Sequence, residues 1–261
     1  MRAQWLGIVA GLWVGSAVMG GPVTFMSADM RADVSVDAIT VGGGATSHKE
    51  GHDTADLTKR VASAEATASL PFSGLDYPAS RGSARANFNP DDAGFRLDGN
   101  ADAVVFVKST PFSGSGTSQA LTTLNFNLAA PGSYDLRWEA GVLATTLSEK
   151  TRLNLSLLDS HGRSLALVNL GATISDRQSG TRALDLAAGD YTFGLDAQAN
   201  ADLVGRLGEG DSGNVSYQVS LAPSAGTGGV TIPLPPALAP GLGVLGVAVV
   251  VVVRRRRGVW C

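Results

Sequence analysis

The sequence predicts an all-β protein: an antiparallel β-sandwich flanked by an N-terminal signal peptide and a C-terminal transmembrane helix. Three observations carry this prediction. Hydrophobic and polar residues alternate through the second half of the chain, which is the period of strands with one buried face. Only 16% of the 261 residues are charged and 33 are glycine, a balance that favours strands and turns over solvated helices. An apolar run stands at each end of the chain.

Residues 1–20 have the layout of a secretory signal peptide. Arg2 precedes the apolar run 5–19, and Val18 and Gly20 occupy positions −3 and −1 of a cleavage after Gly20. The run is shorter than the roughly 20 residues that span a bilayer. We therefore expect export machinery and signal peptidase to process this end. An uncleaved N-terminal anchor is the alternative.

Residues 21–57 are expected to form a polar, partly mobile N-terminal segment that supplies an edge strand. Residues 34–40 alternate as a strand does, and three consecutive glycines at 42–44 then break the pattern. The polar stretch that follows places His48 and His52 four residues apart, a spacing that could share a divalent metal on a helix. Because no apolar periodicity supports a helix there, a solvated loop is the preferred interpretation.

The β-sandwich is expected to span residues 58–223. The signal for its first strand is weak, because the alternating residues of 61–70 are mostly alanine, serine and threonine. Larger apolar side chains between 88 and 107 predict strands more clearly. A hairpin unit then occurs twice, at 124–138 and 184–195, with a turn of two alanines and a glycine before a strand that starts with tyrosine. Sheets with one apolar face bury that face by stacking, which gives a sandwich.

Residues 224–231 form a linker of small residues, and residues 232–261 form a sorting or anchor segment in three parts. A proline-containing motif comes first. The apolar stretch 237–253 follows, and as a helix of about 26 Å it would just cross a thin bilayer. Four adjacent arginines then keep the unprocessed C-terminus in the cytoplasm. The motif consists of Ile232, Pro233, Leu234 and Pro235, and the membrane stop signal of Arg254, Arg255, Arg256 and Arg257.

This tail resembles the PEP-CTERM sorting signal of Gram-negative bacteria that secrete exopolysaccharide. The resemblance implies recognition by exosortase, a membrane-embedded transpeptidase-like enzyme, with residues 232–235 as a variant motif. Leu234 stands where the family usually has Glu. A Gram-positive sortase signal fits worse, because the Thr-Gly that it requires is missing after Pro235. A plain tail anchor that is never cut is the alternative.

The body also resembles known modules in its pattern. The strands around 126–136 look like the extracellular β-sandwiches that PEP-CTERM proteins carry. The block Gly189-Asp190-Tyr191-x-Phe193 is similar to bacterial pre-peptidase C-terminal domains and other jelly-roll modules. These resemblances imply a jelly-roll-like, noncatalytic surface module, and they name no ligand.

Processing of both ends would change the charge of the protein. Removal of residues 1–20 and of the tail from Ile232 takes away five arginines and no acidic residue, so the net charge falls from −3 to −8. A chain this acidic repels nucleic acid and anionic membrane surfaces. The single cysteine, Cys261, lies in the tail, so packing or bound ions must stabilise the body without a disulfide.

Calcium is the one cofactor that the sequence suggests. Asp98, Asn100 and Asp102 place oxygen-bearing side chains at alternating positions, as calcium loops do. The later glycine and the distal glutamate of an EF-hand are missing. A turn rich in Asp and Asn, formed for conformational reasons alone, is the alternative.

Sugar binding would require aromatic side chains that face solvent. The larger aromatic residues of the second half lie on alternating apolar faces, so core packing explains them better. These are Trp138, Tyr134, Tyr191 and Tyr217. Tyr77 is expected in a loop and is the better candidate for exposure.

The sequence therefore predicts an exported protein that is not an enzyme. It would be held at the membrane, or sorted to the cell surface or extracellular space, and act as a structural or interaction component of the envelope or the extracellular polysaccharide matrix. The alternative is a carbohydrate-binding module that retains exopolysaccharide. No carboxylate pair or nucleophilic motif in the sequence supports a hydrolase.

Overall fold

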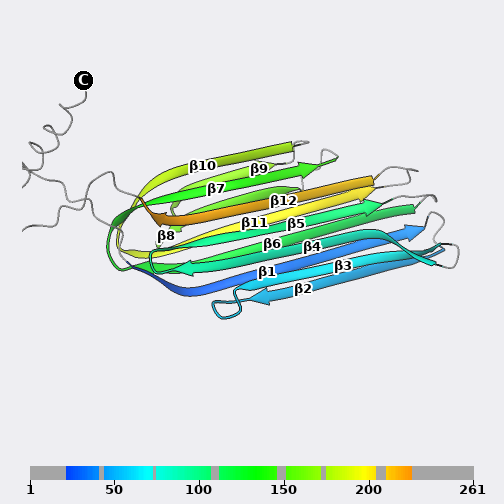
Figure 1. The fold of residues 1–261 in the computed structure, drawn as a ribbon, viewed down its shortest axis with the longest axis horizontal. Coiled ribbons are helices and arrows are strands. Elements are labelled where there is room, and N and C mark those ends of the chain that lie inside the picture. Colours follow the sequence, from blue (N-terminus) through cyan, green and yellow to red (C-terminus); the bar gives the residue numbers. More distant parts are fainter. Residues whose placement is uncertain are drawn as a thin grey trace, which may run out of the picture. The chain divides into compact units, whose positions relative to one another are not determined.

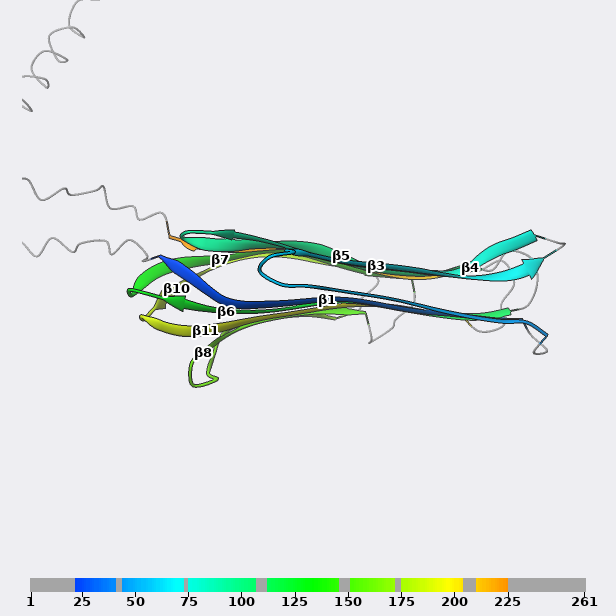
Figure 2. The ribbon, with the colours of Figure 1, turned by 90° about the horizontal axis from the view of Figure 1, so that it is seen from below.

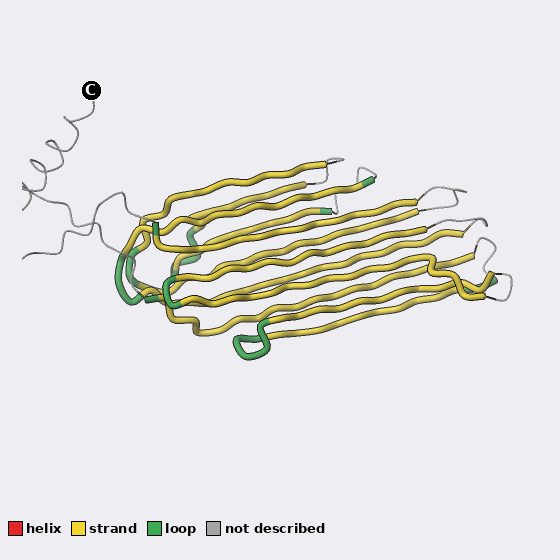
Figure 3. Tube along the Cα trace, viewed as in Figure 1, coloured by secondary structure: helices red, strands yellow, loops and turns green. Residues whose placement is uncertain are grey.

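A computed structural model gives the fold, and in its described parts nearly the whole chain is β-strand (Figure 3). Both terminal segments, and with them the predicted signal peptide, linker and sorting tail, fall outside those parts. Within them, no helix is long and apolar enough to cross a bilayer. The described residues are 22–40, 44–72, 75–106, 112–145, 151–171, 175–203 and 210–224.

The strands form two antiparallel sheets of six, here called sheet A and sheet B (Figure 1). In spatial order, sheet A contains β2 (Thr46–Ala55), β1 (Val23–Thr40), β6 (Phe112–Leu128), β11 (Gly189–Leu203), β8 (Arg152–Asp159) and β9 (Ser164–Gly171). Sheet B contains β10 (Ser175–Leu186), β7 (Gly132–Ala144), β12 (Gly210–Pro223), β5 (Gly94–Phe106), β4 (Leu75–Asp91) and β3 (Val61–Phe72).

The two sheets stack face to face as two layers (Figure 2). Along most strands buried residues alternate with exposed or half-buried ones, as in β12, because successive side chains of a strand point to opposite faces. The edge strand β2 buries only Ala55. The alternating apolar faces meet in one continuous core. The predicted all-β antiparallel sandwich is confirmed.

The sandwich begins earlier than residue 58, where the sequence placed its start. β1 lies inside sheet A between β2 and β6, and the edge strand is β2. The sequence signal was weak because most of the side chains that β1 buries are small, so its apolar face is narrow. Met30, Ala32, Val34, Val36 and Ala38 are each at most 3% exposed.

Large side chains fill one end of the core. Phe25 and Phe88 meet edge to face with ring centroids 5.1 Å apart, and Phe95 contacts Phe193 in the same manner at 5.1 Å. Phe126 joins this cluster at 5.8 Å from Phe95. Aromatic rings bury large areas and contribute most of the packing energy of such a core. These rings fill the space between the two sheets at this end of the core.

Small residues with valines between them fill the central part of the core, and there the sheets come close together. The Ser80 hydroxyl on β4 donates a hydrogen bond to the Asp37 carbonyl on β1 at 2.6 Å. The Ser118 hydroxyl on β6 donates to the Asp102 carbonyl on β5, also at 2.6 Å. Stacked sheets ordinarily lie about 10 Å apart, and a serine side chain reaches the opposite backbone only when that spacing is smaller.

Gly82 on β4 shows how little space this region leaves. A Cβ atom at this position would lie 2.6 Å from Ser118 Oγ and would also overlap the Val34 side chain, both on the opposite sheet. Any larger side chain would force the sheets apart. The small residues are therefore a requirement of the close spacing.

We predict that Gly82→Ala destabilises the protein by about 1–3 kcal/mol, because overpacking a filled core costs that much. Gly171→Ala on β9 is the matched control, since no atom lies within 4 Å of the added Cβ. It should leave stability unchanged or raise it by up to about 1 kcal/mol. Urea unfolding of both variants measures the difference. Equal stability of the two would contradict a steric limit at Gly82.

Candidate functional site

The outward face of sheet B carries polar residues in rows that run across the strands. Antiparallel pairing aligns one residue from each of five strands, so side chains more than a hundred residues apart in sequence become neighbours. The central row consists of Arg85 on β4, Asn100 on β5, Ser216 on β12, Gly141 on β7 and Arg177 on β10.

Two further rows flank the central one. Both place a carboxylate of β5 beside an amide of β12, and one of them continues to a second carboxylate on β7. The first flanking row consists of Asn87, Asp98, Gln218, Glu139 and Ser179. The second contains Ser83, Asp102, Asn214 and Leu143.

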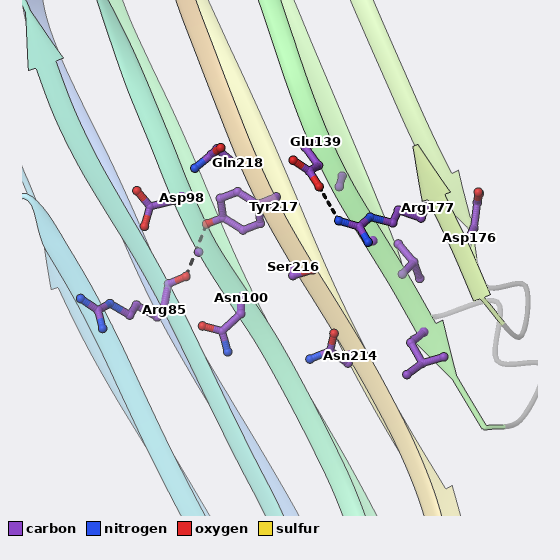
Figure 4. A pocket seen from close by; sticks show the side chains of 15 residues that line it. Arg85, Asp98, Asn100, Glu139, Asp176, Arg177, Asn214, Ser216, Tyr217 and Gln218 are labelled. Carbon is purple, nitrogen blue, oxygen red and sulfur yellow. Dashed lines mark hydrogen bonds and ion pairs between the residues drawn. The ribbon is translucent and has the colours of Figure 1, made fainter. Parts of the chain in front are cut away.

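A groove of about 740 Å³ follows these rows. Ser216 and Gly141, the two smallest side chains of the central row, form its floor, while longer side chains rise around them. Figure 4 shows Arg85, Asp98 and Asn100 on one side, Glu139 and Arg177 on the other, and Ser216 and Gln218 between them. The groove is open to solvent and mostly polar.

Hydrogen bonds between neighbouring strands hold part of this lining in place. The Asp102 carboxylate accepts hydrogen bonds from the side-chain amides of Asn100 and Asn214. Glu139 forms an ion pair with Arg177. By contrast, the side chains of Arg85 and Gln218 make no hydrogen bond or ion pair with any other described residue. Their polar groups are therefore free to bind a ligand.

Tyr217 supports the groove from inside the core. Its ring crosses β5 at Gly99, where a Cβ would lie 2.6 Å from Tyr217 Cζ. Its hydroxyl lies 3.4 Å from the Arg85 carbonyl and donates a hydrogen bond to it. Burial raises the pKa of Tyr217 well above its usual value, so the phenol stays neutral and remains a donor. The tyrosine thus ties β12 to β4 beneath the floor.

The three predicted calcium ligands do not form a tight turn. Asp98, Asn100 and Asp102 lie on the outward face of β5, which is extended through all three. At about 3.3 Å per residue, Asp98 and Asp102 are separated by about 13 Å along the strand. Calcium ligands must all lie within 2.3–2.6 Å of the ion. Among the described residues, no three His, Cys, Asp or Glu side chains are grouped to hold a metal.

The aromatic residues follow the core-packing prediction. Tyr134, Tyr191 and Tyr217 are at most 6% exposed, which confirms the prediction for them. Trp138 is half-buried and packs against the core beside Gly180. The loop predicted for Tyr77 was wrong: this residue belongs to β4 and pairs with Leu70 of β3. Tyr217 is the one aromatic residue among those that line the groove, and because it is buried the groove presents no exposed aromatic platform.

The two histidines lie on an edge strand, where a solvated loop was predicted. β2 places His48 and His52 on the outward face of sheet A, opposite Asp37 and Asp33 of β1. His48 Nδ1 lies 2.6 Å from Asp37 Oδ1, and His52 Nδ1 lies 2.5 Å from Asp33 Oδ1. Each imidazole has its own carboxylate, and the extended strand keeps the two rings too far apart to share a metal.

The His48 imidazole also contacts Glu50 through Nε2, at 3.1 Å. The hydrogen bonds that the imidazole donates to Asp37 and, to a lesser extent, to Glu50 raise the pKa of His48 above its ordinary 6.5. A raised pKa stabilises the folded state while the histidine is protonated, below about pH 6.5, and this contribution is lost as the pH rises through the folded-state value. The contact of His48 with Asp37 therefore stabilises the pairing of β1 with β2 more at a pH below about 6.5 than at higher pH.

Of the groove residues, only Asp98 and Asn100 were singled out by the sequence pattern, and for a different role. Arg85, Ser216 and Gln218 are polar positions in ordinary alternating strands, and that alternation predicts only that they face solvent. The register between strands brings them together. The predicted sorting residues, 232–235 and 254–257, lie outside the described residues.

Comparison with known proteins adds little to this description. No family model matches the chain, and no curated protein matches it. Among solved structures, that of the infectious bursal disease virus Gx strain is similar with a TM-score of 0.27 and 9% identity, over 82% of this chain and 59% of the other. The VP2 subviral particle of infectious bursal disease virus gives a TM-score of 0.24 and 10% identity, over 78% and 57%. Likenesses at this level carry no conclusion about function.

We predict that the His48 imidazole titrates with a midpoint above 6.5, because Asp37 and Glu50 stabilise its charged form. Asp37→Asn should lower that midpoint. Asp33→Asn, which removes the partner of His52, is the matched control and should leave His48 unchanged. NMR titration of the ring protons measures all three proteins. A His48 midpoint that is the same in Asp37→Asn as in the unchanged protein would show that the contact does not form.

Proposed function

We propose that this chain is an exported, noncatalytic surface protein, anchored in the membrane or sorted by an exosortase-like enzyme, with a structural or interaction role in the envelope or its polysaccharide matrix. One observation carries the proposal. The strands of the sandwich run from Val23 to Pro223. A signal-like segment precedes them in the sequence, and a tail that consists of the proline motif, the apolar stretch and the four arginines follows them. A body bracketed in this way is delivered outward and then held at the membrane.

The strand order supports a jelly-roll assignment within this proposal. Strands β5-β12-β7-β10 and β6-β11-β8-β9 are neighbours in the two sheets. From β5 onward the chain changes sheet at every connection except that between β8 and β9. This is the arrangement of an eight-stranded jelly roll, a fold of capsid and lectin domains. The remaining strands, β1 to β4, extend both sheets on the same side.

The polar pairing on the outward faces suits a protein that works in contact with a matrix. On sheet A, Gln119 donates to Asp196 at 2.9 Å and Asn127 donates to Asp190 at 2.6 Å, each pair joining neighbouring strands. Such bonds fix exposed side chains in place and lower the entropy lost on binding. Two broad, ordered polar faces support an interaction role.

We predict that cell fractionation finds the protein in the membrane or outside the cell. We also predict that mass spectrometry of the mature protein does not detect the peptide that follows the proline motif. Replacing Pro233 and Pro235 should stop this maturation. Replacing the four arginines 254–257 with serine should release unprocessed protein from tail retention, because the charges that halt translocation are gone.

Two outcomes separate the versions of this proposal. An intact C-terminal peptide on surface protein would leave simple anchoring and exclude cleavage. Full-length protein in the cytosol would overturn the proposed function altogether.

A further inference from the structure

The geometry of the sheet B groove points to a binding site for a neutral polysaccharide chain. This inference rests on the proposed surface role and deepens it, since it names the class of ligand that the module would hold. Four features of the groove carry it: its direction, its lining, its charge and its floor, which inner strands of the sheet form.

The groove runs straight across five strands. Arg85 and Arg177 end the central row, and four strand spacings of about 4.8 Å separate them by about 19 Å. Ser216 and Gly141 keep the middle of this row low. A linear chain of several sugar rings fits such a shallow track, and both of its ends can continue into solvent.

The lining offers hydrogen-bond donors and acceptors in alternation. Arg85 supplies only donors and Asp98 only acceptors, while Gln218 supplies both. A sugar hydroxyl is itself a donor and an acceptor, so it can bond to neighbouring groups of both kinds. Among the described residues, the side chains of Arg85 and Gln218 have no competing partner. The exposed aromatic rings that the sequence analysis expected of a sugar site are absent from this lining, so recognition here would depend on hydrogen bonds to sugar hydroxyl groups alone.

The charge of the groove selects a neutral chain. Its lining contains two arginines, Arg85 and Arg177, against three carboxylates, Asp98, Glu139 and Asp176. Arg177 is already paired with Glu139. Asp98 also lies 3.9 Å from Arg96, which is outside the lining. The groove therefore has no excess of positive charge with which to attract acidic polysaccharides or nucleic acids.

The position of the groove excludes an extended peptide bound by strand addition. Such a peptide needs the free backbone groups of a sheet edge. The floor strands β5, β12 and β7 are each paired on both sides, so their backbone groups are already bonded. Only side chains remain available to bind a ligand, and at the floor these are the serine hydroxyl of Ser216 and the bare backbone of Gly141.

The test is affinity electrophoresis of the full-length protein, solubilised in a detergent without a sugar head group. Native gels would contain dextran, galactomannan or hydroxyethylcellulose as neutral polymers, or alginate as an acidic one. We expect at least one neutral polymer to slow the protein and alginate to leave its mobility unchanged.

Gly141→Gln fills the floor of the groove and should weaken this retardation about tenfold, as the loss of one or two hydrogen bonds would. A Cβ at Gly141 meets only Ser216 Oγ, at 3.4 Å, so the fold tolerates the change. Gly194→Gln is the matched control on the outward face of sheet A, where the Cβ would meet Ser156 Oγ at 3.0 Å. It should bind like the unchanged protein.

A second pair keeps the test independent of any effect on folding. Gln218→Ala only shortens an exposed side chain in the groove and should also weaken retardation, whereas Gln198→Ala on sheet A should not. The inference is overturned if no neutral polymer slows the unchanged protein, if alginate slows it, or if groove and control variants behave alike. If the protein is found at the cell surface but no neutral polymer slows it, this inference alone is wrong. If the full-length protein is found in the cytosol, the proposed function is wrong whatever the electrophoresis shows.

Discussion

The close approach of the two sheets in the centre of the sandwich is the constraint on which the rest of the structure depends. It requires glycine where a strand faces a valine of the other sheet: a Cβ at Gly82 would overlap the Val34 side chain, and one at Gly114 would lie 2.7 Å from Val105 Cγ1. The hydroxyls of Ser80 and Ser118 then satisfy their hydrogen bonds on the opposite backbone. A buried hydroxyl without a partner would be costly. The two serines therefore require the close spacing of the sheets, and the close spacing in turn requires small side chains.

The outward faces follow from the same alternation. Since the inward positions are small or apolar, every second residue is left to the surface, and the register aligns these residues in rows. On sheet B the rows create a groove where Ser216 and Gly141 face each other between longer polar side chains. The site therefore needs no special loop. It arises in the middle of a regular sheet and is held there by Tyr217 from below.

The sequence predicted the fold best where side chains are large. The strands within 124–138 and 184–195 were clear because phenylalanine, leucine and tyrosine mark the buried face. The hairpins predicted there were wrong, because β6 and β7 lie in different sheets, and so do β10 and β11. Only residues 34–40 of β1 were predicted as a strand, in a segment expected at the edge of the sandwich, because alanine and valine mark its buried face only weakly. The turn expected at 98–102 is a strand, and its glycine, Gly99, makes room for the Tyr217 ring. The groove could not be predicted, because it depends on which strands pair and in which register.

The small-residue core has a thermodynamic consequence. The heat capacity of unfolding rises with the apolar area that becomes exposed and falls with the polar area. A core that is aromatic at one end but filled with alanine, glycine and serine hydroxyls at its centre exposes less apolar area per residue than one of leucine and phenylalanine throughout. The stability of this sandwich should thus vary less steeply with temperature than that of a thicker sandwich of equal length.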